Sequence, residues 1–278
     1  MTTETTHIWI PDTQAKPGVK IAQHGWVGQY IADKFVGKPL VVIGGGDHAD
    51  MPSLSSYDRG TGKMEGRRYV KDIAVANEAW HLLSDPIRSA ESALRADRKR
   101  DKANPFVAPR LVKLRGNHED RITRAANQNV QLEGIVSLDH LDDCGWEVHD
   151  YQTVVTIDGV AYSHFFYNPM TGRPYGGQSI DTRLKTIGYS FGMGHQQGLK
   201  VGMRDLTNGK RQRGFVAGSC YLHDEEYLGP QGNSPWQGIL VMHNVHGGDY
   251  NLMEIDLDYL CQRYEGVSLK RFKVRHYQ

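Results

Sequence analysis

The sequence has little cysteine and no long hydrophobic run. Its three cysteines are widely spaced, and none belongs to a Cys-x-x-Cys pair: Cys144, Cys220 and Cys261. An odd and scattered set argues against a disulfide scaffold or a cysteine-based zinc site, and it fits a reducing cytoplasm. No run approaches the roughly 18 apolar residues that a membrane-spanning helix needs, so we expect no membrane partner.

An excess of one charge sign is also missing. The chain has 33 Lys and Arg against 32 Asp and Glu, a net charge of +1, which excludes a global polybasic signal for nucleic acid. The first residues, Met-Thr-Thr-Glu-Thr-Thr-His, lack the basic and apolar stretches of a signal peptide. Both observations are typical of a cytoplasmic protein.

The composition and the order of the expected elements favour one α/β domain over residues 1–278. Hydrophobic residues make up 39% of the 278, enough for a core, and no linker interrupts the chain. The first half predicts strand–helix–strand units, with strands at 7–11, 39–43 and 110–114 and helices at 19–36, 68–98 and 119–133. Pro86 is expected to break or kink the second helix.

From about residue 145 the pattern is mostly short strands. They are expected at 146–149, 152–157, 160–166, 189–193, 199–203, 213–217, 238–245 and 250–256. A helix is expected at 179–188, and loops at 167–178 and 223–235.

Polar clusters follow several of these strands. In chain order they are Asp12-Thr13-Gln14, Gly46-Asp47-His48, Gly116-Asn117-His118-Glu119, Ser163-His164 and Gly194-His195-Gln196-Gln197. Residues just past the carboxyl ends of strands in an α/β sheet converge on one crevice. A mixed set of carboxylate, amide and imidazole groups suits a pair of Mn, Fe, Zn or Mg ions rather than a structural zinc.

In order and content these clusters resemble the motifs of the calcineurin-like metallophosphoesterases, which read DxH, GD, GNH(E/D), a lone His and GHxH. The similarity spans about residues 7–256 and is nearest to compact phage and bacterial members, including those like DNA-repair exonucleases. It implies a four-layer α/β/β/α sandwich with two mixed sheets. If the chain is encoded by a phage, the resemblance implies that it acts in the cytoplasm of the host. Two departures stand out: Gln14 and Gln197 occupy positions where the family has His.

The resemblance implies two divalent metal ions as cofactors. One would take Asp12, Gln14, Asp47 and Gln197. The other would take Asp47, Asn117, His164 and His195, with Asp47 as the bridge. Amide oxygens favour Mn or Mg at the first site, while Fe or Zn suits the histidine-rich second site. His118 would face the leaving-group oxygen, so His118 and Asp47 are the expected catalytic residues.

Several assignments leave an alternative open. Gln14 and Gln197 could hydrogen-bond to ligands instead of binding metal, whereas Asp50 and Glu119 are expected to support ligands and His48 to point away. In the loop at 167–178, Tyr167, Arg173 and Tyr175 could stack on a base and contact phosphate, or the aromatic residues could form a small satellite core.

The expected function is hydrolysis of phosphodiester bonds in DNA, RNA or nucleotides by metal-activated water. A phosphomonoesterase is the alternative within enzymes. The other alternative is a catalytically degenerate member that binds a partner without hydrolysis, which the two glutamines would favour. The histidine at 118 argues against it, because a pure binding protein needs no leaving-group donor.

Overall fold

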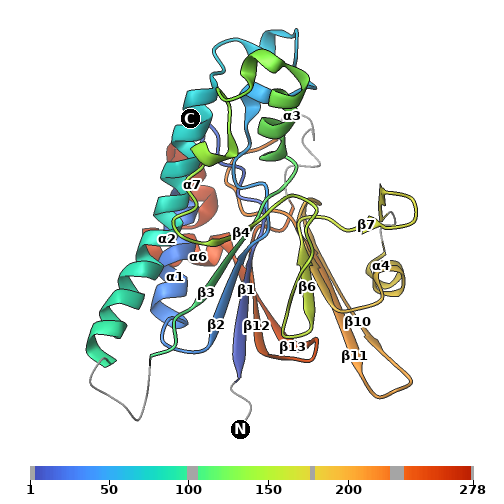
Figure 1. The fold of residues 1–278 in the computed structure, drawn as a ribbon. Helices are drawn as coiled ribbons and strands as arrows, with labels where there is room; N and C mark the ends of the chain where they lie inside the picture. Colours follow the sequence, from blue (N-terminus) through green and yellow to red (C-terminus); the bar gives the residue numbers. More distant parts are fainter. Residues whose placement is uncertain (1–3, 99–105, 176–178, 226–234, 277–278) are drawn as a thin grey trace.

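The structure is a computed structural model that describes residues 4–98, 106–175, 179–225 and 235–276. Over these ranges the chain forms six α-helices and two mixed β-sheets, together with a two-stranded ribbon (Figure 1). The α/β class that the sequence predicts is therefore confirmed. Parts of the two expected loops, 176–178 and 226–234, lie outside the described residues. Within the described part of the chain, no helix combines the length and the apolar character needed to cross a bilayer.

The larger sheet has the order β13-β12-β1-β2-β3-β4. Its strands are β1 (Thr5–Ile10), β2 (Leu40–Gly44), β3 (Arg110–Leu114), β4 (Glu147–His149), β12 (Gly238–His246) and β13 (Asp249–Asp256). The four strands from β1 to β4 are parallel neighbours, and β12 pairs antiparallel with both β1 and β13. Parallel neighbours need a crossover, and helices supply it between β1 and β2 and between β2 and β3.

The smaller sheet has the order β10-β11-β9-β6-β5. Its strands are β5 (Val155–Ile157), β6 (Val160–Ser163), β9 (Phe191–Met193), β10 (Leu199–Asp205) and β11 (Arg211–Ala217). The ribbon is β7 (Tyr167–Asn168) with β8 (Arg173–Pro174). The helices are α1 (Ala22–Lys34), α2 (Tyr69–Arg98), α3 (Asp120–Gln128), α4 (Ile180–Ile187), α6 (Leu257–Glu265) and α7 (Leu269–His276).

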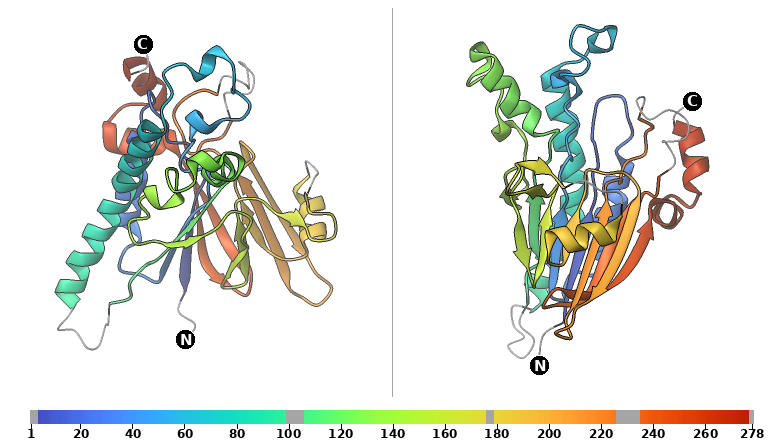
Figure 2. Two further views of the ribbon diagram at one scale, coloured as in Figure 1. Left: turned by 45° about the horizontal axis from the view of Figure 1, so that its top comes forward. Right: turned by 90° about the vertical axis from the view of Figure 1, so that its right-hand side faces the viewer.

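Side chains along β1 point alternately to the two faces of the larger sheet, and those on each face belong to a different hydrophobic core. Ile8 and Ile10 join a core with residues of α1, α2, α6 and α7. Trp9, which points to the opposite face, packs between the two sheets against Tyr162 and Phe215. A third core joins α4 to the outer face of the smaller sheet, across which α4 lies in the right-hand view of Figure 2. Helices and the smaller sheet thus cover the two faces of the larger sheet, and α4 covers part of the outer face of the smaller sheet.

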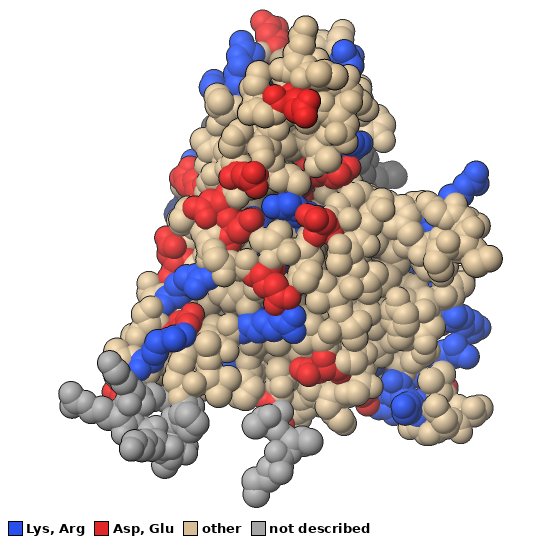
Figure 3. All heavy atoms as spheres, viewed as in Figure 1, with Lys and Arg blue, Asp and Glu red and all other residues tan. Residues whose placement is uncertain are grey.

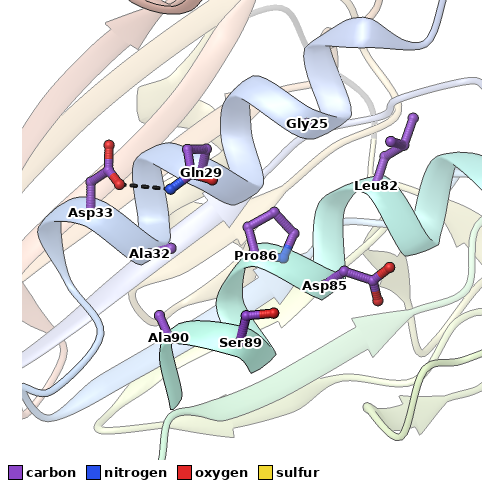
Figure 4. A pocket seen from close by; sticks show the side chains of 9 residues that line it. All are labelled: Gly25, Gln29, Ala32, Asp33, Leu82, Asp85, Pro86, Ser89 and Ala90. Atoms are coloured by element: carbon purple, nitrogen blue, oxygen red, sulfur yellow. Dashed lines mark hydrogen bonds between the residues drawn. The ribbon is translucent and has the colours of Figure 1, made fainter. Parts of the chain in front are cut away.

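The structure corrects the sequence-based expectations in two places. α2 continues through Pro86 as one helix, so of the expected break or kink the break does not occur. Pro86 lines a surface hollow between α1 and α2 (Figure 4). Proline has no N–H to donate to the carbonyl of Leu82, four residues earlier. Leu82 is exposed, so solvent reaches this turn of the helix. The chain also continues after the last strand into α6 and α7, which the sequence interpretation does not include.

Replacing Pro86 with Ala should stabilise the protein. The substitution restores the N–H that α2 lacks at this position, and proline in a helix interior costs about 3 kcal/mol of stability. Alanine leaves the unfolded chain freer than proline does, which offsets up to about 1 kcal/mol of this gain. We expect the free energy of unfolding in urea to rise by about 2 kcal/mol. The control Ser89→Ala, one turn further along an exposed face, should change it by less than about 0.5 kcal/mol. A loss of stability in Pro86→Ala would contradict this account of the helix.

Candidate metal centre

The strand topology brings the five polar clusters to one edge of the molecule. Asp12, Asp47 and Asn117 follow β1, β2 and β3, which are parallel neighbours in the larger sheet. His164 and His195 follow β6 and β9, which are parallel neighbours in the smaller sheet. Because parallel strands end at the same edge, each sheet contributes its own set of ligand-type side chains.

The backbone is unusual at three of the predicted ligands. Gln14, Asp47 and His195 have positive φ angles of 43°, 50° and 64°. Residues other than glycine adopt this left-handed region at a cost, and such residues cluster at functional sites. The Gln14 N–H donates to the Asp47 carbonyl at 2.9 Å, which joins the turn after β1 to the turn after β2.

Glycines allow the backbone to approach the acidic side chains. A Cβ at Gly116 would overlap the carboxylate and the backbone nitrogen of Asp47, and a Cβ at Gly194 would overlap the Asp12 carboxylate. Only a residue without a side chain fits at these two places. Gly116 and Gly194 therefore leave the space that the carboxylates of Asp47 and Asp12 occupy.

One group of donors has the spacing of a metal site. Asp47, His164 and His195 each offer a ligand atom, and the three atoms lie within 4.8 Å of one another. The Nδ1 of His164 donates to the Gly45 carbonyl at 2.9 Å, which leaves Nε2 facing the Asp47 carboxylate at 3.3 Å. Histidine ligands usually donate their second ring N–H in this way. The Asn117 Oδ1 lies 3.0 Å from His164 and 2.8 Å from His195.

The charges around this group favour a cation. Burial alone would raise the pKa of Asp47, but His118 and His164 lower it well below its usual range. Burial lowers the pKa of His164, yet Asp47, followed by Asp12, raises it to about 10. The pKa of Asp12 is raised because its carboxylate is fully buried and lies near Asp47. The two buried carboxylates are thus balanced by imidazoles in this structure, and a divalent ion would also balance them.

The other predicted metal site, that of Asp12, Gln14, Asp47 and Gln197, offers oxygen atoms as ligands. The Asp12 carboxylate accepts the His195 N–H at 3.0 and 3.1 Å. The Oε1 of Gln14 is buried and has no hydrogen-bond partner among the described residues. A buried carbonyl oxygen without a partner is a ligand type that suits a hard cation. Gln197 is half-buried two residues beyond His195, and its role as a ligand stays a prediction.

Glu119 supports the centre from behind. Its carboxylate accepts three backbone N–H groups, from Asp47 at 3.1 Å, Ala49 at 2.8 Å and Gly116 at 2.8 Å. It therefore joins the turn after β2 to the turn after β3, as expected of a supporting residue.

The imidazole of His48 is held away from the ligands, as the sequence predicts. Its two ring nitrogens lie 2.8 Å from the Thr13 hydroxyl and 2.8 Å from the Ala76 carbonyl on α2.

His118 is held beside the ligands without joining them. The backbone N–H of His118 donates to the Asp47 carboxylate at 2.8 Å, and the ring Nδ1 lies 2.6 Å from the Asp50 carboxylate. The Nε2 lies 3.1 Å from an Arg121 nitrogen and 3.7 Å from Asp47. Burial lowers the pKa of His118, but Asp47 and Asp50 together raise it above its usual value. Lys16 contacts Asp50 at 3.1 Å and completes the support.

A cleft of about 870 Å³ opens on the His118 side of the centre. Asn117, His118 and Arg121 line one wall, and residues between 52 and 72 supply much of the rest. Its charged residues have both signs: Lys16, Lys63, Arg67, Arg68, Lys71, Arg121, Asp50, Asp58, Glu65, Asp72, Asp224 and Glu225. The face seen in Figure 3 likewise intersperses the two signs.

The predicted substrate residues lie in a loop whose tyrosines pack on the core between α4 and the smaller sheet. Tyr167 and Tyr175 pack against the cluster that contains Phe165 and Phe166, which agrees with the satellite-core alternative. Arg173 is exposed on the β7–β8 ribbon. Contact of these three residues with a substrate stays a prediction.

Sequence reasoning missed Tyr151 near the centre. Its ring centroid lies 6.2 Å from that of His164, and its hydroxyl lies 2.6 Å from the Tyr167 hydroxyl. A signal was present, because Tyr151 follows the end of β4, a parallel neighbour of β3.

No protein-family model matches this sequence, and no curated protein is significantly similar to it. The functional interpretation therefore depends on the residues and geometry of this centre.

Replacing Gly116 with Ala should weaken metal binding, because the added methyl group would displace the Asp47 carboxylate. We expect the affinity for Mn²⁺, measured by isothermal titration calorimetry, to fall about 10–100-fold, as for disturbed ligand supports. The control Gly62→Ala adds its methyl group to open space and should bind as the wild type does. Circular dichroism would check folding. Unchanged affinity in folded Gly116→Ala would refute the placement of Asp47 in the site.

Proposed function

We propose that this protein is a phosphodiesterase dependent on two divalent metal ions, acting on DNA, RNA or a nucleotide. The observation that carries the proposal is the shared position of Asp47. Its carboxylate lies 3.3 Å from His164 in the ligand group and 3.7 Å from the Nε2 of His118, the expected leaving-group donor. A binding protein would need no such neighbour.

The residues present would hold two cations. Asp12, Gln14, Asp47 and Gln197 would hold the first, for which their oxygen atoms favour Mn or Mg. Asp47, Asn117, His164 and His195 would hold the second, where Fe or Zn is also suitable. When bound, a metal pair lowers the pKa of a water molecule and neutralises charge on the phosphate.

The protein's own groups would then act on the leaving group. Asp50 contacts Nδ1 of His118 and so sets the orientation of the ring. A proton on Nε2 would pass to the leaving oxygen as its bond to phosphorus breaks. An Arg121 N–H faces Nε2 at 3.1 Å in this structure, so Arg121 would turn aside, toward the phosphate, when Nε2 carries that proton.

The cleft favours a diester over a monoester. It adjoins His118, so it lies where the leaving group of the substrate would be, and its volume of about 870 Å³ accommodates a group of nucleotide size. Its mixed charge matches a limited number of phosphates better than a long polyanion. The phosphomonoesterase and the degenerate binding protein remain the alternatives, and Gln14 and Gln197 favour the latter.

The same proposal includes the finer architecture and the location. We propose the four-layer α/β/β/α sandwich of the calcineurin-like metallophosphoesterases. The helices on one face of the larger sheet, the smaller sheet on its other face and α4 support this proposal. The three cysteines are free thiols, which supports a cytoplasmic location.

Hydrolysis assays would separate the three functions. With Mn²⁺ added, the protein should cleave bis(p-nitrophenyl) phosphate faster than p-nitrophenyl phosphate. His118→Ala should lower kcat about 10²–10⁴-fold at unchanged metal content, the usual value of general acid–base catalysis. His246→Ala, in an exposed hairpin, is the matched control and should retain activity. Faster cleavage of the monoester would identify a phosphatase, and metal binding without turnover of either ester would identify a binding protein.

The two metal ions should bind with unequal affinity. The protein as purified should hold metal first at the histidine-rich site. The glutamine-containing site should fill only when Mn²⁺ or Mg²⁺ is added, and activity should rise as it fills. Neutral amide oxygens bind more weakly than imidazole to borderline metals. In a stepwise titration, Gln14→Ala with Gln197→Ala should weaken only the second step. If that step is unchanged, the two glutamines are not ligands.

A further inference from the structure

A second group of metal-ligand side chains lies on α2 and the loop before β4. His81 and Asp85 occupy successive turns of α2, while Asp142 and Cys144 belong to the loop. A ligand atom of His81, one of Asp142 and one of Cys144 lie within 4.8 Å of one another. No residue of this group belongs to the centre described above.

Distances around His81 Nδ1 match a tetrahedral site. The Cys144 Sγ lies 3.6 Å from Nδ1, and an Asp85 carboxylate oxygen lies 3.5 Å from the same atom. In a tetrahedral zinc site, bond lengths of about 2.3 Å to sulfur and 2.0–2.1 Å to nitrogen place the two ligand atoms about 3.5 Å apart. The i, i+4 spacing puts His81 and Asp85 on one face of the helix.

Asp142 orients two members of the group. One of its oxygens accepts the Nε2–H of His81 at 2.9 Å, and the other accepts the Cys144 N–H at 2.8 Å. A carboxylate that holds the far nitrogen of an imidazole is a common support of zinc ligands, because it leaves Nδ1 as the free electron-pair donor.

The loop itself is fixed to α2 independently of any ion. Asn77 bonds to Asp142, Trp80 to the Asp143 carbonyl, and Arg88 to the Cys144 carbonyl. The ligand-bearing backbone is therefore already in place, and binding requires little rearrangement.

We propose that His81 and Cys144 bind a divalent cation of the zinc type, with Asp142 as the orienting group. The exposed Asp85 side chain, 3.5 Å from His81 Nδ1, turns toward Cys144 to complete the set, and one position stays open to water. Sulfur and imidazole ligands select Zn²⁺ or Co²⁺ over Mg²⁺ or Mn²⁺. The site is separate from the proposed catalytic centre and does not depend on the proposed phosphodiesterase function. Bound metal would join helix α2 to the loop that leads into β4.

Burial and the nearby Asp142 raise the pKa of the Cys144 thiol to about 11. The metal-free thiol is consequently protonated, and metal binding would release that proton as the Sγ–metal bond forms.

Cobalt provides a direct test, because a thiolate bound to Co²⁺ gives a charge-transfer absorption that nitrogen and oxygen ligands do not. Titration of the full chain with CoCl₂ should produce this band, and Zn²⁺ should remove it while Mg²⁺ should not. Cys144→Ser and His81→Ala should abolish the band. Cys261→Ala, on helix α6, and Asp47→Asn, in the other centre, should retain it.

A second measurement uses the wild-type protein alone. Zn²⁺ should slow alkylation of Cys144 by iodoacetamide at least tenfold, read out by mass spectrometry of the Cys144 peptide, whereas Mg²⁺ should not. Absence of the cobalt band, its survival in Cys144→Ser, or unchanged alkylation with Zn²⁺ would each overturn the proposal.

Discussion

The buried negative charge of Asp47 is the constraint on which the centre depends. Its side chain is almost fully enclosed, and an isolated carboxylate in such a place would cost several kcal/mol. The N–H of His118 and the imidazole of His164 compensate this charge, while Glu119 holds the backbone on either side. All these contacts require β2 beside β3 and the smaller sheet against the larger one.

The sequence predicts the part of the centre that strand topology determines. Polar residues after apolar strands identify Asp12, Asp47 and Asn117, because parallel strands end together and the pattern is local. Pairs formed across long stretches of chain leave no such pattern. The contact of His118 with Asp50 and that of His81 with Cys144 depend on packing between separate elements. Sequence spacing carries no information on either contact.

The aromatic loop and the C-terminal helices show two further reasons for incomplete prediction. A tyrosine such as Tyr167 has the same chemistry whether it stacks on a ligand or packs on Phe165, so only its neighbours decide. Leu257, Leu260 and Cys261 do have helical spacing, but many charged residues follow and the apolar stripe is short. The helix is stabilised by packing of this stripe against the face of the larger sheet, which the local sequence does not show.

The place of β1 in the larger sheet has a consequence for synthesis of the chain. β1 is flanked by β2, which follows early, and by β12, which is made near the end. Until β12 emerges from the ribosome, one edge of β1 has no pairing partner, and its backbone groups can join strands of other molecules. A nascent or truncated chain ending before residue 238 would therefore be prone to aggregate. Completion of this sheet must also be a slow folding step, because it joins distant segments.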